Sequence, residues 1–308
     1  MTELQTVVAA VDDGDSSAAA ALLGAHLADT AHGGRFFGVH CVPPIPAALE
    51  ELLFPYAGLG EDYDELRAAV ADAAQRRVAR RLKRWAPQAT PHVTSGDVVD
   101  GLLRACDELG PTILLAATAP DVAGRWHIGP TTDGLARRAP ATFVAARSTP
   151  HTTPTPPKRI VACVDLTPSS GQVIVAALEL AARFGGQVQP VYVAATAADL
   201  DPAGVLGNDR SAVGRAKRDI TNRWAQIEAS LDLRPPIAAN AATLLGAKVV
   251  TSGDPGPKLC EVASEAGADL VVAGRSRGTG MGRVAEYLLR HAHAHVALVT
   301  LQDAEVAS

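Results

Sequence analysis

A segment rich in glycine and arginine near the end of the chain has the composition of an anion-binding loop. It runs from Gly274 to Arg283 as GRSRGTGMGR, after the apolar residues 271–273 and before a helix-like stretch. A glycine-rich turn between a strand and a helix N-terminus exposes backbone N–H groups to a phosphate, and arginines add positive charge. The segment therefore predicts a phosphate site, and a surface loop without a ligand is the alternative. The candidate residues are Gly274, Arg275, Ser276, Arg277, Gly278, Gly282 and Arg283.

Two aspartates end apolar runs that have the composition of strands. Asp12 ends the run TVVAAVD, and Asp165 ends the run RIVACVD. A carboxylate at this place can accept hydrogen bonds from a ribose or an adenine. As a turn residue it can equally begin the next helix without any ligand. Both interpretations stay open for both aspartates.

The tetrapeptide TSGD occurs twice, and its aspartates, Asp97 and Asp254, stand where a helix is expected to begin. Helix capping by itself explains an aspartate there. The glycine before it, Gly253 in the second copy, lets the backbone approach a ribose closely. Both copies belong to a repeat that spans the chain, since each half opens with a strand that ends in Asp and closes with an apolar run. The repeat predicts two homologous domains.

The elements that must position these residues are short β-branched runs that alternate with longer amphipathic runs. This alternation predicts two tandem, doubly wound α/β domains with parallel sheets, whose ligands bind at the carboxyl ends of the strands. The expected strands are 6–11, 36–42, 92–94, 112–117 and 141–146, then 160–164, 187–193, 248–250, 269–273 and 295–300. The expected helices include 16–30, with Asp15 or Ser16 as N-cap, 61–85, and helices that begin at Val98, Pro255 and Val284. The first helix of each half is expected to end at a glycine pair, Gly33-Gly34 or Gly185-Gly186.

A segment rich in proline and threonine separates the two halves. Residues 148–158 hold four prolines among threonine and histidine and lack apolar periodicity, which is typical of a semi-rigid spacer. The sequence therefore predicts domains at 1–147 and 159–308 with a linker at 148–158.

Composition argues against several classes of function. The 308 residues carry a formal net charge of −5 and only 4% aromatic residues, which disfavours nucleic-acid binding. A run of cations at 76–84 is explained by a solvated helix face near a helix C-terminus. No segment approaches the roughly 18 apolar residues of a membrane helix, so we expect a cytoplasmic protein that makes no membrane contact. The four single cysteines are expected to be buried, reduced thiols.

No residue pattern predicts a catalyst or a metal site. His291, His293 and His295 alternate at an expected helix-to-strand junction, but no carboxylate or cysteine stands beside them. No Ser/His/Asp, paired-carboxylate or Cys/His order is present either. The sequence thus favours a binding protein over an enzyme.

These residues resemble the universal stress protein family in its tandem two-domain form, over nearly the whole chain. The likeness rests on the strands that end in Asp, on Gly-Asp before a helix, on VHCVP at 39–43 and VYV at 191–193, and on VAEYLLRHA at 284–292. It implies a five-stranded parallel sheet with flanking helices in each half, the adenine-nucleotide alpha-hydrolase-like fold. It also implies pairing of domains through their last strands, so that the two halves form an intramolecular pseudo-dimer, with a homodimer as a further form.

The resemblance further implies ATP binding in members that keep the motif Gly-x2-Gly-x9-Gly-Ser/Thr. In the second half Gly274 and Gly282 match its first and last glycines, although the loop is shorter and Arg283 stands at the Ser/Thr place. In the first half Gly129 remains, and Pro130 takes that place. The implied contacts are Asp165 and the Val193 backbone for adenosine, Gly253 for ribose, and Gly274, Gly278 and Gly282 for phosphates, with Asp12, Cys41 and Gly129 as first-half counterparts.

The leading hypothesis is a stress-response regulator that binds an adenine nucleotide, chiefly in its second domain. The expected ligand is ATP, with AMP and cyclic AMP as alternatives, with or without Mg²⁺, and the expected partner is an unidentified regulatory protein. A nucleotide-free scaffold that acts through protein–protein contacts is the second hypothesis, and a slow ATPase is the third.

Overall fold

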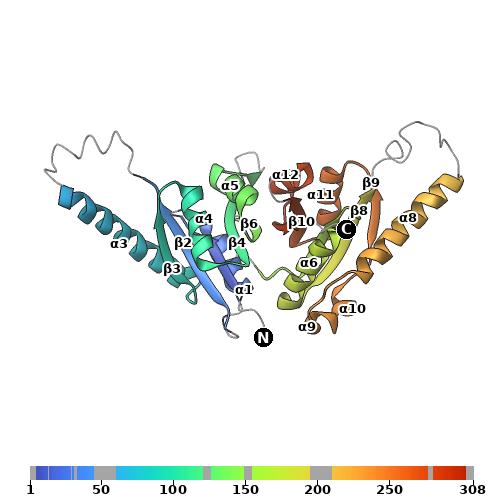
Figure 1. Ribbon diagram of the computed structural model, residues 1–308, viewed down its shortest axis with the longest axis horizontal. Coiled ribbons are helices and arrows are strands. Elements are labelled where there is room, and N and C mark those ends of the chain that lie inside the picture. The colour runs from blue at the N-terminus through green and yellow to red at the C-terminus, as the bar shows by residue number, and fades with distance from the viewer. Residues whose placement is uncertain are drawn as a thin grey trace, which may run out of the picture. The chain divides into compact units, whose positions relative to one another are not determined.

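The computed structural model describes residues 5–12, 14–28, 30, 33–44, 60–120, 126–148, 155–194, 210–276 and 280–302. The chain divides into two compact units, with Thr155 in the first and Pro156 in the second. Each unit is a parallel sheet with helices on both faces (Figure 1). The prediction of two tandem α/β domains is therefore confirmed. The bounds given for the domains and the linker stay predictions.

Five parallel strands form the sheet of the first unit, in the order β3-β2-β1-β4-β6. A short additional strand, β5, pairs with β4. The strands are β1 (Thr6–Ala10), β2 (Arg35–Val42), β3 (Thr90–Ser95), β4 (Ile113–Pro120), β5 (Trp126–His127) and β6 (Thr142–Arg147). The inner strand β1 is apolar and almost fully buried, as expected for a parallel strand that is covered on both faces.

In the part of the first unit that the structure describes, four helices cover this sheet in two layers. α1 (Ser17–Leu27) and α3 (Gly60–Trp85) contact each other on one face, and α4 (Val98–Leu109) and α5 (Pro130–Arg138) contact each other on the opposite face. The apolar side of α3 lies on β2, where a Cβ at Gly38 would come within 2.5 Å of Leu82 Cδ1. A glycine on the strand thus lets this helix pack close to the sheet.

The second unit repeats this arrangement. Its parallel strand order is β9-β8-β7-β10-β11. The strands are β7 (Arg159–Val164), β8 (Gln187–Ala194), β9 (Val249–Ser252), β10 (Leu270–Ser276) and β11 (His295–Leu301). One layer holds α6 (Ser170–Phe184) and α8 (Arg210–Ala229) with the short helices α9 (Pro235–Ala238) and α10 (Ala241–Leu244), and the other holds α11 (Pro255–Glu265) and α12 (Arg283–His291).

The expected strands and helices are all present, with bounds that differ by one to three residues at most ends. One predicted helix end is wrong, because α1 ends at Leu27 with Ala28 as its C-cap and does not reach the glycine pair. In the second unit Gly185 is the C-cap of α6 and adopts the left-handed conformation, as predicted. No helix among the described residues is long and apolar enough to cross a membrane.

Candidate functional site

Asp165 stands directly after β7, at the carboxyl edge of the second sheet. Its Oδ1 accepts hydrogen bonds from Thr167 N (3.0 Å), Thr167 Oγ1 (2.6 Å) and Ser170 Oγ (2.7 Å). These bonds close the turn that leads into α6, so Asp165 does have the turn role that its sequence position allows. Among the described residues, every hydrogen bond to this carboxylate reaches Oδ1. The lone pairs of Oδ2 therefore stay available to a further donor.

The carboxyl group of Asp165 is ionised at neutral pH. Burial acts to raise its pKa, but the hydrogen bonds from Thr167 and Ser170 outweigh burial and hold the pKa below its usual value. The end of β7 therefore presents a negative acceptor in a fixed orientation.

The ends of β8 and β9 lie next to this loop in the sheet order. Val193 of β8 is in register with Thr251 of β9, and the Gly253 N–H donates to Ala194 O (3.2 Å) just beyond the ladder. Gly253 has a φ of +140°, which side-chain-bearing residues rarely adopt, and a Cβ there would meet only the stem of Lys258, at 3.8 Å. The backbone turn therefore requires glycine, and it leaves this strand end without a side chain.

The glycine- and arginine-rich segment begins inside β10 and not after it. Gly274 packs against β11, since a Cβ at this position would lie 2.7 Å from Leu301 Cδ1. Close packing by itself thus explains this glycine. Ser276 is exposed at the end of the strand, and Arg277 and Gly278 lie outside the described residues.

The segment ends at the N-terminus of α12. Gly282 is the N-cap, with a φ of +71°, and a Cβ there would meet nothing within 4 Å. Among the described residues no side chain caps the helix, so its first backbone N–H groups are left for water or for a ligand. Arg283 is exposed in the first position of α12. This end of the segment has the local geometry that binds anions.

The sequence predicts Arg275 as an exposed phosphate contact, but the structure buries its side chain in the sheet. Its side chain is buried in β10, with 4% of its surface exposed, and its guanidinium donates to Thr300 Oγ1 on β11 (2.7 Å). The first unit contains the same pair with the partners exchanged, because buried Arg147 on β6 donates to Thr118 Oγ1 on β4 (3.0 Å). Both pairs stand in register across neighbouring strands.

Two of the first-unit counterparts show simple local roles. Asp12 Oδ1 accepts a hydrogen bond from Gly14 N (2.8 Å) in the turn before α1. Gly129 is the N-cap of α5, and Pro130 follows it in the first helical position. Proline has no N–H, so α5 offers one donor fewer at its N-terminus than α12 does.

Arg104 of α4 fills the space beside Gly96, the first-unit counterpart of Gly253. A Cβ at Gly96 would lie 3.2 Å from a guanidinium nitrogen of Arg104, which donates to the Ser95 carbonyl. Cys41 is 6% exposed, its Sγ lies 3.6 Å from the Gly96 carbonyl oxygen, and burial raises the pKa of its thiol. No motif in the sequence pointed to Arg104, because only the packing of α4 brings it to this strand end.

The predicted capping aspartates differ between the units. Asp97 caps α4, accepting from Val99 N and Asp100 N at 3.0 Å each. Asp254 occupies the same place before α11 but makes no side-chain cap hydrogen bond. The carboxylate of Asp97 is thus used to cap α4, whereas the carboxylate of Asp254 makes no capping hydrogen bond to α11.

Within the described part of the chain, metal-binding groups do not assemble at either sheet edge. The described residues contain no cluster of three or more His, Cys, Asp or Glu side chains that could hold a metal ion. All four cysteines are free thiols. Cys41 and Cys106 are buried as predicted, whereas Cys163 and Cys260 are only partly so.

Residues 3–147 and 156–300 each match the model of the universal stress protein family. This chain belongs to the universal stress protein family. No curated protein matches it in sequence.

Solved structures of similar proteins share the fold of this universal stress protein. One is a universal stress protein from Archaeoglobus fulgidus DSM 4304, with a TM-score of 0.63, 12% identity, and coverage of 96% of this chain and 98% of that chain. Another is a functionally unknown protein from Pseudomonas aeruginosa PAO1, with a TM-score of 0.62, 12% identity, and coverage of 97% and 94%. At these identities the likeness concerns the fold alone.

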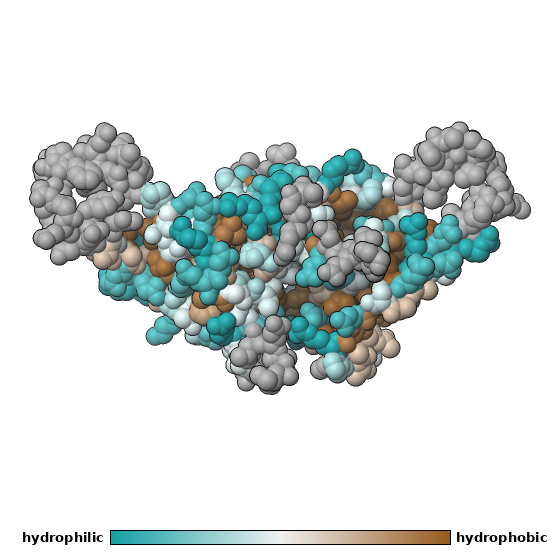
Figure 2. Space-filling model, viewed as in Figure 1, coloured by the Kyte–Doolittle hydropathy of each residue, from teal (hydrophilic) through white to brown (hydrophobic). Residues whose placement is uncertain are grey.

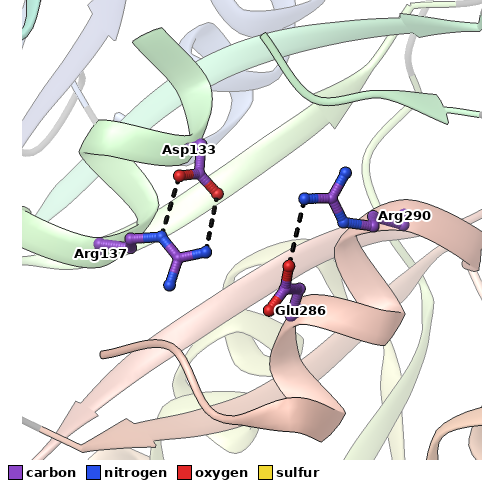
Figure 3. A network of polar contacts seen from close by, with 4 residues as sticks. All are labelled: Asp133, Arg137, Glu286 and Arg290. Atoms are coloured by element: carbon purple, nitrogen blue, oxygen red, sulfur yellow. Dashed lines mark hydrogen bonds and ion pairs between the residues drawn. The ribbon is translucent and has the colours of Figure 1, made fainter. Parts of the chain in front are cut away.

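The helix after the fourth main strand of each unit carries an acid–arginine pair, which the sequence analysis missed. On α5 the Arg137 guanidinium holds Asp133 with two hydrogen bonds (2.9 and 3.2 Å), and on α12 Arg290 holds Glu286 (3.1 Å), as Figure 3 shows. Each pair spans one turn of its own helix and is partly exposed, so it stabilises the helix by only tenths of a kcal/mol. On α12 the pair offsets the negative charge of Glu286 near the candidate anion site.

Proposed function

We propose that this universal stress protein binds an adenine nucleotide, ATP by preference, at the carboxyl edge of its second sheet. One observation carries the proposal: Gly282 begins α12 with a φ of +71°, without a capping side chain and with open space where a Cβ would stand. A phosphate fits such a helix N-terminus, because unpaired N–H groups point at it and the helix dipole favours negative charge. Arg283 adds a cation at the same place.

The adenosine part of the ligand would be held by the neighbouring strand ends. Asp165 offers Oδ2 as an oriented, ionised acceptor for an N–H or O–H group. The side-chain-free turn at Gly253 lets a ribose approach the backbone at the end of β9. Arg275 is not part of this proposal, because its guanidinium is buried against Thr300. The phosphate contacts are assigned to Gly282 and Arg283.

The first unit is poorly suited to the same ligand. Arg104 stands where a ribose would approach Gly96, and Pro130 removes a donor from the N-terminus of α5. We therefore assign one nucleotide to each chain. Binding would act on the association of this protein with a regulatory partner in a stress response.

Two other functions remain as alternatives. A nucleotide-free scaffold is favoured by the turn bonds of Asp165 and the packing role of Gly274, which explain those two residues without any ligand. A slow ATPase would need a base or a metal to activate water. Since no pattern in the sequence predicts such a base, turnover is the third of these functions.

The test combines released ligand with calorimetry on the full-length protein. Freshly purified protein is heat-denatured and the supernatant is analysed by mass spectrometry, after which ATP, AMP and cyclic AMP are titrated into native protein. The Gly282→Val variant adds a side chain at the N-terminus of α12, and we expect it to weaken nucleotide binding by at least about tenfold, since it blocks the N–H groups there.

The control variant is Gly185→Val. Gly185 also has a positive φ (+61°) with nothing within 4 Å of its Cβ position, but it lies at the C-terminus of α6, away from the strand carboxyl ends. It therefore suffers similar backbone strain without touching the site. Equal affinity in the two variants would count against Gly282 as the phosphate site. Absence of any released or bound nucleotide would favour the scaffold.

A further inference from the structure

Asp254 is an exposed aspartate that directly follows the turn at Gly253, at the carboxyl edge of the second sheet. It stands at the N-cap position of α11, yet its side chain makes no capping hydrogen bond. In Figure 2 hydrophilic residues gather near the top of the second unit, where Figure 1 places α11 and α12. The contacts that we assign to the nucleotide leave this carboxylate unused.

The sequence of α11 explains why Asp254 does not cap this helix. In the first unit Asp97 caps α4 by accepting from the N–H groups two and three residues further along the chain. In α11 the residues at these two positions are Gly256 and Pro257. Proline has no N–H, so the second of the two donors is missing. Asp254 therefore gains less from capping its helix than Asp97 does.

The first cation of α11 is bound to a different acid. Lys258 stands four residues after Asp254, at a spacing that suits an ion pair on a helix. Its Nζ instead lies 2.7 Å from Glu261 Oε1, while its stem lies beside Gly253. Among the described residues no hydrogen bond or ion pair holds the Asp254 carboxylate. It is therefore available to a donor from a ligand.

The strand order separates acidic from basic groups along this sheet edge. Strands β9, β8, β7 and β10 follow one another, and the Gly253 N–H fixes the turn before Asp254 to Ala194 O at the end of β8. Asp254 follows β9 and Asp165 follows β7, so their strand ends lie two strand spacings apart, about 10 Å. Arg283 stands beyond β10, on the other side of Asp165. The acids thus lie where an adenosine offers N–H and O–H groups, and the cation lies where phosphates offer oxygen atoms.

We infer that Asp254 selects the sugar of the ligand, because its carboxylate accepts hydrogen bonds from the 2′- and 3′-hydroxyls of a ribose at Gly253. The inference rests on the proposed nucleotide site and deepens it, since it names the ligand as a ribonucleotide with both hydroxyls free. A carboxylate at a strand end binds ribose hydroxyls in doubly wound sheets, and its hydrogen bonds are stronger than those of a neutral acceptor. Cyclic AMP is disfavoured, because its phosphate occupies the 3′ oxygen and brings negative charge toward Asp254.

Calorimetry of the full-length protein with ATP, 2′-deoxy-ATP, 3′-deoxy-ATP and cyclic AMP tests the inference. We expect the natural protein to bind ATP about tenfold more tightly than each of the other three, since each of them lacks a hydroxyl that donates to Asp254. The Asp254→Ala variant is expected to bind ATP and the two deoxy analogues with equal affinity. The ratio of affinities is the readout, so a general weakening of binding does not imitate the expected result.

Two further variants of α11 give matched comparisons. Pro257→Ala returns the missing N–H, so we expect Asp254 to cap the helix and the preference for ATP over 2′-deoxy-ATP to fall. Glu265→Ala removes the same charge from an exposed position at the other end of α11, and we expect it to keep the preference. Circular dichroism confirms that each variant is folded.

The inference is overturned if the natural protein binds ATP and 2′-deoxy-ATP equally well, or if Asp254→Ala or Pro257→Ala keeps the full preference. It is also overturned if Glu265→Ala loses the preference as readily as Asp254→Ala. Failure of the nucleotide proposal gives a different result, because none of the four ligands then binds. Binding of ATP without a preference between the sugars removes the role of Asp254 and leaves the nucleotide site in place.

Discussion

Arg147 in the first unit and Arg275 in the second are buried near the ends of their strands. Each has a structural role that the sequence around it does not reveal. Arg275 stands in a run that has the composition of a phosphate loop, yet its guanidinium bonds Thr300 on the next strand. In the first unit the arginine is on the last strand, as Arg147, and the threonine is on the fourth, as Thr118. A buried guanidinium needs hydrogen-bond acceptors. Both units therefore contain an arginine–threonine pair, although the strand that carries the arginine in one unit carries the threonine in the other.

At the residue scale we predict that Thr300→Val destabilises the second unit. The change keeps the shape of the side chain but removes an acceptor from a buried charge, and such losses cost about 1–3 kcal/mol. Urea denaturation followed by circular dichroism measures the effect. Thr243→Val, at an exposed position on α10, serves as the control and should change stability by less than about 0.5 kcal/mol. A Thr300→Val variant as stable as the control would show that the hydrogen bond contributes nothing.

At the element scale, the same pair of helices packs in both units with the large and small residues exchanged. In the second unit a Cβ at Gly256 of α11 would lie 2.8 Å from Tyr287 Cγ on α12. In the first unit the glycine is on the other helix, and a Cβ at Gly134 of α5 would lie 2.9 Å from Val99 of α4. Each interface thus pairs one glycine with one bulky residue, so that the side chain from one helix packs directly on the backbone of the other.

We predict that Gly256→Ala destabilises the second unit, because its methyl group overlaps the Tyr287 ring. Overpacking of this kind costs about 1–3 kcal/mol. Tyr287→Ala removes the ring atoms that the new methyl group meets, so the double variant should be less destabilised than the sum of the two single variants. A double-mutant cycle by urea denaturation measures this coupling. Additive effects would mean that the two helices separate freely to accommodate the methyl group.

At the scale of the whole molecule, the repeat preserves the fold and varies the sheet edges. Both units have the same strand order and the same two helix layers. Their carboxyl edges differ, because Arg104 and Pro130 stand in the first unit where the second unit has an open turn and a helix with an available N–H. This difference is the reason why we propose the second unit, and not the first, as the one that binds a nucleotide.

We predict that calorimetry finds close to one ATP site per chain. Asp165→Asn should weaken that site by at least about tenfold, since a charge-assisted hydrogen bond contributes about 1.5–3 kcal/mol. The matched change in the first unit, Asp12→Asn, should leave affinity and stoichiometry unchanged. Two sites per chain, or an equal loss of affinity from the two variants, would contradict the assignment of the nucleotide to the second unit.

The sequence determined the features that contiguous residues encode. The apolar runs predicted every main strand, the repeat predicted two units, and the aspartate after β7 was placed at the carboxyl edge because its turn chemistry is local. The predicted end of α1 at the glycine pair was wrong, although the same signal was correct at Gly185. A glycine permits a helix to end at it but does not oblige the helix to extend so far.

Only the tertiary structure decided which residues meet across strands and helices. In the folded chain the Arg275 guanidinium donates to Thr300, Gly274 packs against the side chain of Leu301, and the Arg104 guanidinium lies beside Gly96. These outcomes depend on strand order, register and helix packing, which join residues far apart in the chain. Local composition fixed where a ligand site can be built, and long-range packing decided which of its side chains remain free to bind.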